Sequence, residues 1–516
     1  MDTLKNDDKL TVINRSSQYL ISKKLILKVP YFEKMLSHDS LESTESKVEL
    51  DFDEKALKLI LHRIEHGYIF IEMDCVINLC TIADYFGMDN HLINECLTHF
   101  HDNFSIEHLP VIIPQVTSTS KLINSGTLNA FICRYFTKIV NTSVWLDYPI
   151  ETIEYICALD LMIYSEVKVF DSIMKWVKSK PDSRKSYLKN LLKSIRWCHL
   201  EDKDLAKIKE NIYVKSSDFD PKLCCRDKSG CNCSTDRTKQ KYFIAIEKLD
   251  ATNLRVKVLD KNFFLLVNQA IQSDESMPLK LIHDEHVSDV FFDSGRKMIR
   301  IDWKQKKYRL LEAATFQSHF TKCLMLISDE QKRQEHYAVK INNPLNSEQA
   351  SESSLLEADD KFILVRFYGK QFKYWAMPTD ENIRSHFWLK GRSCLGTVLD
   401  NNIYMLTDRL ELIQFKIDRK CEFERIEFEK YREKFYSDSL LLTSNLTNDK
   451  VIIIEKSTKE LFCYNVKTEK WSSMGRISNC DSGSDGKTKS HDLIAFTSTF
   501  LSMDAIKACL NMNSNE

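Results

Sequence analysis

The stretch SKKLILKVPYFEKMLSHDSLESTESKVEL, Ser22–Leu50, joins a lysine-rich amphipathic run, a Pro-Tyr-Phe sequence, an acidic loop and a short strand-like end. Helical and extended patterns follow each other closely in it, as in a small mixed domain. No catalytic side chains stand at a useful spacing. The stretch therefore predicts a structural or partner-binding role.

The length and charge of the chain limit the number of domains and the classes of partner to be expected. The chain has 516 residues, enough for about three domains. Its 73 basic and 74 acidic residues leave a net charge of -1, which gives no reason to expect nucleic acid or an anionic membrane as a partner. The local basic run RTKQK, residues 237–241, is expected to be a solvated loop. No apolar run approaches the roughly 18 to 20 residues that span a bilayer.

Cysteine usage favours a reducing compartment. The start of the chain, MDTLKNDDKL, lacks the apolar core of a secretory signal, so a cytoplasmic location is expected, with the nucleus as the other candidate. Several of the 16 cysteines stand at apolar positions, where a thiol acts as a small hydrophobe: Cys75, Cys80, Cys96, Cys133 and Cys157.

Metal and cofactor sites are not expected. A second group, Cys224, Cys225, Cys231 and Cys233, could hold zinc in principle, but its spacing is cramped and lacks paired CxxC arms. Ordinary loop cysteines are the expected interpretation, with a structural metal site or a redox role as the alternatives. His62 and His66 stand four residues apart on a predicted helix without a third ligand nearby, and are expected on its solvent face.

The chain is mostly helical up to about residue 215, with two short strand-like runs, LTVI and KVEL, near the start. Asp53 can cap a helix that Gly67 ends, with Leu57, Ile60, Leu61 and Ile64 as its apolar stripe. Ser165 is a good cap for a second helix that Pro181 stops, with its stripe at Phe170, Ile173, Met174 and Val177. The acidic runs DFDEK and LEADD are expected as helix caps or surface.

The period changes after about residue 240. Short β-branched and aromatic runs such as KYFIAIEKL, KMIRIDW, KFILVRFY and KVIIIEK are divided by polar turns. Their starts suggest a unit of about 35 to 50 residues, as in propeller blades. The two best copies are residues 396–426 and 444–474, each with a residue that could pack between blades. Ordinary stacked sheets remain the alternative.

The first part of the chain resembles a BTB/POZ domain. The resemblance rests on Pro30-Tyr31-Phe32, on the amphipathic helix ending at Gly67, and on the run TIADYFGMD that contains Tyr85. Residues 105–215 are similar to the all-helical BACK domain that follows BTB in kelch-like proteins, most closely in SEVKVFDSIMKWVKSKPDSRKSYLKNLLKSIRWCHL, residues 165–200.

The β half resembles degenerate kelch repeats, most clearly at Tyr404 and at Tyr464 with Trp471. Kelch blades usually carry a Gly-Gly pair after the second strand, and here those places are Thr407-Asp408 and Glu455-Lys456. The resemblance thus predicts a multidomain chain, α+β and then all-β. Its parts are a BTB/POZ domain at 7–100, a BACK domain at 105–215, a linker or loop at 216–240, and a degenerate kelch-like β-propeller at 241–510.

The resemblance implies a substrate-recognition adaptor of a cullin–RING ubiquitin ligase. BTB and BACK would bind the cullin, the propeller would bind an unknown protein substrate, and the BTB domain could form a homodimer. The family's cullin motif falls on Ser40, Leu41 and Glu42. Glu42 matches, whereas Ser40 stands where an apolar anchor is usual; Leu41 could replace it if the loop shifts by one residue.

Nothing in the sequence points to an enzyme, since it contains no GxSxG, P-loop or GxGxxG motif. The competing interpretation is a non-ligase scaffold, cytoskeletal or transcription-associated, which Ser40 and the degenerate repeats favour.

Overall fold

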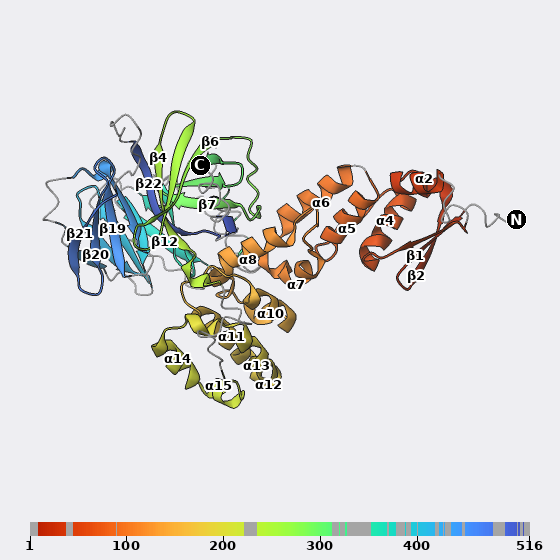
Figure 1. Ribbon diagram of the computed structural model, residues 1–516, viewed down its shortest axis with the longest axis horizontal. Coiled ribbons are helices and arrows are strands. Elements are labelled where there is room, and N and C mark those ends of the chain that lie inside the picture. The colour runs from red at the N-terminus through yellow and green to blue at the C-terminus, as the bar shows by residue number, and fades with distance from the viewer. Residues whose placement is uncertain are drawn as a thin grey trace. The chain divides into compact units, whose positions relative to one another are not determined.

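The computed structural model describes residues 9–37, 45–88, 90–220, 235–311, 319, 323, 326–327, 352–368, 371–377, 387–388, 394–399, 401–417, 423–426, 428, 435–445, 449–477, 491–502, 504–505 and 509. The chain divides into two compact units, Met1–Phe131 and Ile132–Glu516 (Figure 1). The boundary falls inside helix α8 (Ser125–Ile139).

The first unit combines a small sheet with helices. Strand β1 (Lys9–Asn14) lies in the middle, antiparallel to β2 (Ser17–Ser22) and parallel to β3 (Lys47–Leu50). Both predicted strands, LTVI and KVEL, are therefore confirmed. The helical elements that precede α8 are α1 (Lys23–Ile26), α2 (Pro30–Ser37), α4 (Glu54–His66), α5 (Val76–Tyr85), α6 (Asn90–Asn103), η2 (Ile106–His108), α7 (Leu109–Ile112) and η3 (Ile113–Gln115).

The Pro-Tyr-Phe sequence builds the core of this unit. Pro30 begins α2, a position where its missing N–H costs nothing. Phe32 is fully buried, with its ring centroid 4.9 Å from that of Phe86. The backbone N–H of Tyr31 donates to the carbonyl oxygen of Phe86 at 3.2 Å. The opening stretch of the sequence is thus tied to the end of α5.

Helix α4 has the predicted ends. The Asp53 carboxylate accepts a hydrogen bond from the Ala56 N–H at 2.9 Å, and Gly67 ends the helix in the left-handed region at φ +82°. Leu57, Ile60 and Leu61 are buried as predicted, and Ile64 is half-buried.

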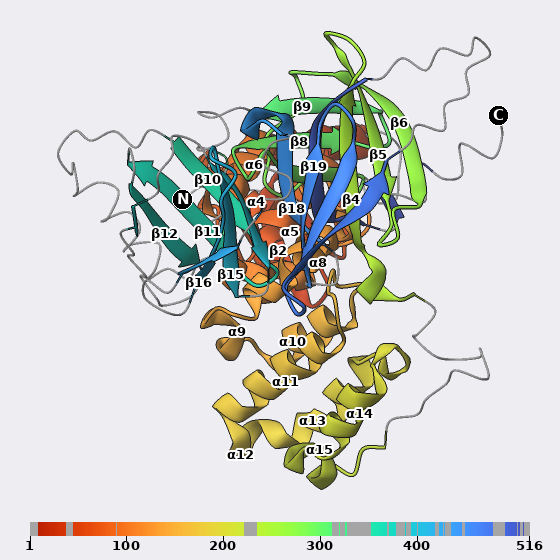
Figure 2. The ribbon, with the colours of Figure 1, turned by 90° about the vertical axis from the view of Figure 1, so that its left-hand side faces the viewer.

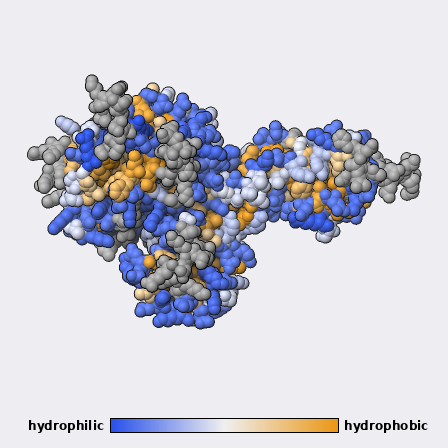
Figure 3. Space-filling view, in the orientation of Figure 1, coloured by the Kyte–Doolittle hydropathy of each residue, from blue (hydrophilic) through white to orange (hydrophobic). Residues whose placement is uncertain are grey.

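The second unit begins with helices and ends in sheets. Its helices after α8 are α9 (Val144–Asp147), α10 (Ile150–Ala158), α11 (Val167–Ser179), α12 (Pro181–Arg184), α13 (Leu188–Leu191), α14 (Asp202–Lys209) and α15 (Ile212–Ser216). On the face drawn in Figure 3 the surface over α11–α15 is predominantly hydrophilic, as expected of helices whose apolar stripes face inward.

Helix α11 follows the prediction closely. The Ser165 hydroxyl accepts from the Val167 N–H at 3.2 Å, and the helix ends at Ser179, before Pro181. The four predicted stripe residues are all buried: Phe170, Ile173, Met174 and Val177.

The β part consists of antiparallel sheets. β10 (Glu352–Glu357), β11 (Phe362–Tyr368), β12 (Gln371–Met377) and β13 (Phe387–Trp388) form one four-stranded sheet. β14 (Cys394–Leu399), β15 (Asn402–Thr407), β16 (Leu412–Lys416) and β17 (Phe423–Ile426) form the next. β18 (Leu440–Ser444), β19 (Lys450–Glu455), β20 (Glu460–Asn465) and β21 (Lys470–Arg476) form a third.

A seven-stranded sheet of order β22-β4-β5-β6-β9-β8-β7 completes the described strands. It consists of two antiparallel groups linked by a two-residue parallel pairing of β6 with β9. In Figure 2, β4–β6 and β10–β12 run as separate sheets. The bounds are β4 (Lys241–Lys248), β5 (Asn253–Leu259), β6 (Leu265–Ser273), β7 (Val287–Phe292), β8 (Lys297–Asp302), β9 (Lys307–Leu311) and β22 (Asp492–Phe500).

The sheets follow one another in a ring. The last strand, β22, pairs antiparallel with the first, β4, and also contacts β7 and β18, while β14 contacts β10 and β18. The Leu355 N–H of β10 donates to the Gly295 carbonyl, in the turn after β7, at 2.8 Å. These contacts are consistent with the predicted propeller and favour it over two stacked sheets. Pairing of the last strand with β4 joins the two ends of the β part, while each sheet keeps a short outer edge strand.

The turns that lack Gly-Gly are held by side chains. The Thr407 hydroxyl accepts from the Glu411 N–H at 3.2 Å, and the Glu455 carboxylate accepts from the Ser457 hydroxyl at 2.8 Å. Each turn also contains a non-glycine residue with positive φ, Leu410 at 59° and Lys459 at 58°. Hydrogen bonds from polar side chains thus stabilise turns for which kelch blades usually use the conformational freedom of glycine.

Trp471 packs between repeats, as predicted. Its ring centroid lies 5.3 Å from that of Tyr464 on the neighbouring strand and 4.6 Å from that of Phe428, which follows the preceding sheet.

Gly295→Ala is expected to lower the free energy of unfolding of the β part by about 3–5 kcal/mol. A Cβ atom at this position, where φ is +72°, would stand 1.7 Å from the Leu355 carbonyl oxygen. The matched control is Gly475→Ala, at φ +97° with open space around it, where only backbone strain of about 1–2 kcal/mol is expected. Thermal unfolding of both variants checks this; equal losses would contradict a close approach at Gly295.

Candidate functional site

The three residues predicted to bind a cullin, Ser40, Leu41 and Glu42, lie outside the described residues. The helix before them, α2, places Tyr31 against Tyr85, with ring centroids 5.1 Å apart. Tyr85 also packs on Phe52 at 5.1 Å and is 52% exposed. Helix α2, which precedes these residues in the chain, therefore packs beside an aromatic ring that is exposed to solvent.

Metal ligands are not gathered in the described part of the chain, where no group of three His, Cys, Asp or Glu side chains could hold an ion. The Cys224–Cys233 group lies outside that part. His62 is half-buried and His66 exposed, and their rings stack with centroids 4.2 Å apart. The apolar cysteines are buried as expected, and burial raises the pKa of Cys133 and Cys157 to about 12. Nor does any described helix have the length and apolarity to cross a membrane.

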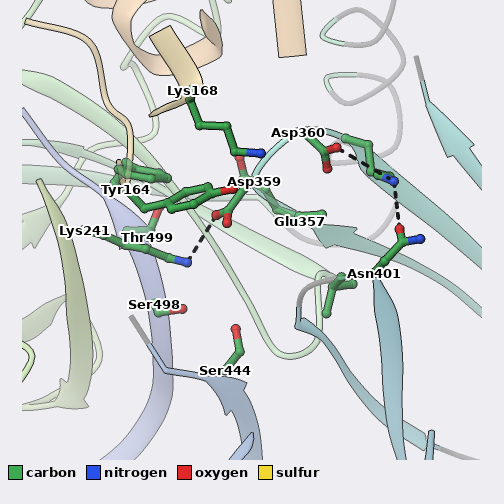
Figure 4. A pocket seen from close by; sticks show the side chains of 14 residues that line it. Tyr164, Lys168, Lys241, Glu357, Asp359, Asp360, Asn401, Ser444, Ser498 and Thr499 are labelled. Carbon is green, nitrogen blue, oxygen red and sulfur yellow. Dashed lines mark hydrogen bonds and ion pairs between the residues drawn. The ribbon is translucent and has the colours of Figure 1, made fainter. Parts of the chain in front are cut away.

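A polar cavity of about 310 Å³ opens in the second unit (Figure 4). Strand ends and turns from different sheets line it together with two residues that precede or begin α11. Its polar lining residues are Tyr164, Lys168, Lys241, Glu357, Asp359, Asp360, Lys361, Asn401, Ser444, Ser498 and Thr499.

Two cations from α8 hold Glu357 at one side of this cavity. Arg134 Nη2 lies 2.7 Å from Glu357 Oε2, and Lys138 Nζ lies 2.9 Å from Oε1. Burial alone would raise the pKa of Glu357, but the two cations outweigh it and lower the pKa to about 2. The carboxylate is therefore charged at neutral pH.

The same helix and Asn141, two residues beyond its end, also bind the turn after Glu357. The Thr137 hydroxyl donates to the Asp359 carbonyl, and the Asn141 amide donates to the Asp360 carbonyl at 3.4 Å. Together with Arg134 and Lys138, these residues stand at i, i+3, i+4 and i+7, one face of a helix. This polar stripe fixes the β10–β11 turn against the helical part of the unit.

Ion pairs continue around the lining. Lys241 Nζ lies 3.3 Å from an Asp359 oxygen, and Lys361 Nζ donates to Asn401 Oδ1 at 3.0 Å (Figure 4). Lys168 lies over the Tyr164 ring at 5.1 Å. Burial would lower the pKa of Lys168, but the Tyr164 hydroxyl and nearby Asp360 raise it, so the ammonium stays charged.

Buried Arg237 contradicts the prediction that RTKQK is a solvated loop. Its guanidinium makes a two-pronged ion pair with Glu166, at 2.6 and 2.7 Å, and both side chains are fully buried. It also donates to the carbonyls of Cys157, Leu159 and Ser194. Buried Glu166 needs a charged partner, and Arg237 provides it. The segment that leads into β4 is therefore bound to the helical part of the unit.

The cavity was missed from sequence because its residues come from separate segments. LEADD was predicted as a helix cap or surface, and the structure corrects this for Glu357, which is a nearly buried ion-pair acceptor at the end of a strand. The available signal was an acidic pair between two predicted strands, where a turn gathers polar groups.

The family model BACK, "BTB And C-terminal Kelch", matches residues 117–210. Human Kelch-like protein 6 is 23% identical over 168 residues, 32% of this chain and 27% of that protein. Mouse Kelch-like protein 28 is 26% identical over 193 residues, which are 37% of this chain and 33% of that protein. Kelch-like protein 40 of Xenopus laevis is 26% identical over 191 residues, which are 36% of this chain and 31% of that protein.

These matches span a third or less of the relatives' own length. Among solved structures, apo AztD from Citrobacter koseri is 9% identical over 50% of this chain and 62% of that one, at a TM-score of 0.22, too low to support an argument. The BACK match, with sheets following it in the chain, and the kelch-like relatives together support assignment of this chain to the BTB–BACK–kelch family.

Proposed function

We propose that the chain is the substrate-recognition adaptor of a cullin–RING ubiquitin ligase. The observation that carries the proposal is the BACK match at 117–210, preceded by an α/β region and followed by a ring of sheets. In this proposal residues 7–100 are a BTB/POZ domain that binds the cullin together with BACK, and residues 241–510 bind a protein substrate.

An adaptor of this kind works by position and is not itself an enzyme. Holding a substrate lysine near a loaded conjugating enzyme raises its effective concentration, so the adaptor needs no acid, base or nucleophile. The ion pairs and hydrogen bonds between the α8 region and the β10–β11 turn support this role, because they limit motion between the helices and sheets of the second unit.

The proposed cullin contact is Ser40–Leu41–Glu42. Support comes from Tyr85, whose exposed ring packs on Tyr31 of the helix that precedes the motif. Exposed aromatic rings are frequent energetic centres of protein interfaces. The proposal includes a homodimer and a cytoplasmic or nuclear location.

A non-ligase scaffold is the second candidate, and Ser40 is the observation that favours it. Burying an apolar anchor is worth roughly 1.5 to 3 kcal/mol. A serine at the anchor position would weaken the cullin contact about tenfold or more.

Capture of a cullin N-terminal fragment by the full chain tests the choice. Wild type is expected to bind the fragment. Glu42→Ala is expected to lower the affinity about tenfold or more, and Ser40→Met to raise it about tenfold. Glu45→Ala is the matched control, since Glu45 is an exposed acid of the same loop and is expected to change nothing. If wild type and Ser40→Met both fail to bind, the adaptor proposal falls and the scaffold remains.

A further inference from the structure

Three hydrogen-bond donors in the cavity face one space. Lys241 begins β4, Ser444 ends β18, and Ser498 lies near the end of β22. Figure 4 shows the Lys241 ammonium and the two serine hydroxyls pointing toward the same opening from separate strands. Such convergence of donors is typical of a binding site, where a few polar groups are directed at the same ligand.

The hydroxyls at this place do not bind other protein groups in the described part of the chain. Neither the Ser444 nor the Ser498 hydroxyl has a hydrogen-bond partner among the described residues. The Thr499 hydroxyl, in a residue that is 4% exposed and also lines the cavity, has none in that set either. Of the three, only the Thr499 hydroxyl is a buried atom without a partner, whereas the two serine hydroxyls are open to the cavity, where water or a ligand can bind them.

The lining itself carries three lysines and three carboxylates, and the excess of positive charge comes from Arg134 and Lys138, which pair with Glu357. The lining and the two residues that hold Glu357 bring together five cations and three carboxylates. Each carboxylate has at least one cation within 4 Å: Glu357 has two, Asp359 has Lys241, and Asp360 has Lys361 at 3.9 Å. Lys168 has no carboxylate at ion-pair distance among the described residues. An anion would therefore be attracted to this space.

We propose that this cavity binds the oxyanion group, phosphate or carboxylate, of a small molecule. Lys241, which also pairs with Asp359, and the Ser444 and Ser498 hydroxyls donate charge-assisted hydrogen bonds to the oxyanion. The volume of about 310 Å³ equals the share of about ten water molecules, so it holds a small metabolite as well as a bare ion.

Asp359 restricts the class of ligand. Its carboxylate lies 3.3 Å from Lys241 and would repel a second anionic group. It would accept a hydrogen bond from a hydroxyl or amine instead. The expected ligand thus carries one oxyanion and a donor group beside it. This goes beyond the proposed adaptor function and does not depend on cullin binding.

Titration calorimetry of the full chain with inorganic phosphate, with acetate and with glycerol tests the site. Phosphate, acetate or both are expected to bind with a Kd of about 1 mM or tighter, and neutral glycerol is expected not to bind. The Ser444→Ala/Ser498→Ala double variant should weaken binding about tenfold or more, and Lys241→Met should do the same. Phosphate against acetate separates the two oxyanions.

The matched controls are Lys248→Met, at the exposed other end of β4, and Ser473→Ala, an exposed serine on β21. Both should bind like wild type. The serine double variant removes only two oxygen atoms and should fold normally, which thermal unfolding confirms. Absence of binding to either anion, equal binding by the double variant, or binding of glycerol alone would overturn the proposal.

Discussion

Arg237→Met is expected to lower the free energy of unfolding by about 3–5 kcal/mol, because it leaves the Glu166 carboxylate buried without its counter-charge. The pair is fully buried and two-pronged, so solvent cannot replace the lost guanidinium. The three carbonyls that Arg237 satisfies would lose their donor as well. Urea unfolding followed by tryptophan fluorescence measures the loss.

The control is Lys239→Met, because Lys239 ends the 3-10 helix η8 (Arg237–Lys239) that Arg237 begins. Lys239 is 73% exposed and its ion pair with Asp236 is a surface pair, so the expected change is below about 1 kcal/mol. The double variant Glu166→Met/Arg237→Met is expected to recover part of the stability, since no charge is then left buried. A single variant as stable as Lys239→Met would show that the pair does not tie the start of β4 to the helices.

The features that could be predicted from sequence are local. Asp53, Gly67 and the stripe of α11 were found because caps and apolar spacing are set by neighbours within two turns. The ring of sheets was anticipated from two repeat copies, although its turns use Thr407 and Glu455 in place of glycines.

The features that could not be predicted join distant segments. Glu166 and Arg237 are 71 positions apart, and Glu357 is 223 from Arg134. A single sequence shows each of them only as a charge, and charges in polar runs usually face water. The cavity has the same origin, because strand ends from several sheets meet there only after the ring has closed. The cullin motif and the Cys224–Cys233 group stay predictions, outside the described residues.

The second large effect is expected at Glu357. Glu357→Gln leaves Arg134 and Lys138 facing a neutral amide, and should cost about 3 kcal/mol at neutral pH, as a pKa lowered from 4.5 to about 2 implies. Glu460→Gln is the control, because Glu460 is an exposed acid at the start of β20 and its loss should change little.

The stability difference between wild type and Glu357→Gln should depend on pH in one direction. The folded pKa of about 2 lies below the unfolded value of 4.5, so the carboxylate stabilises the fold fully above pH 4.5. This stabilisation is lost as pH falls toward 2, and the two proteins should converge. Urea midpoints measured from neutral pH down to about pH 3 test this. A difference that stays constant with pH would mean that Glu357 acts through shape, and that α8 does not hold the β10–β11 turn by charge.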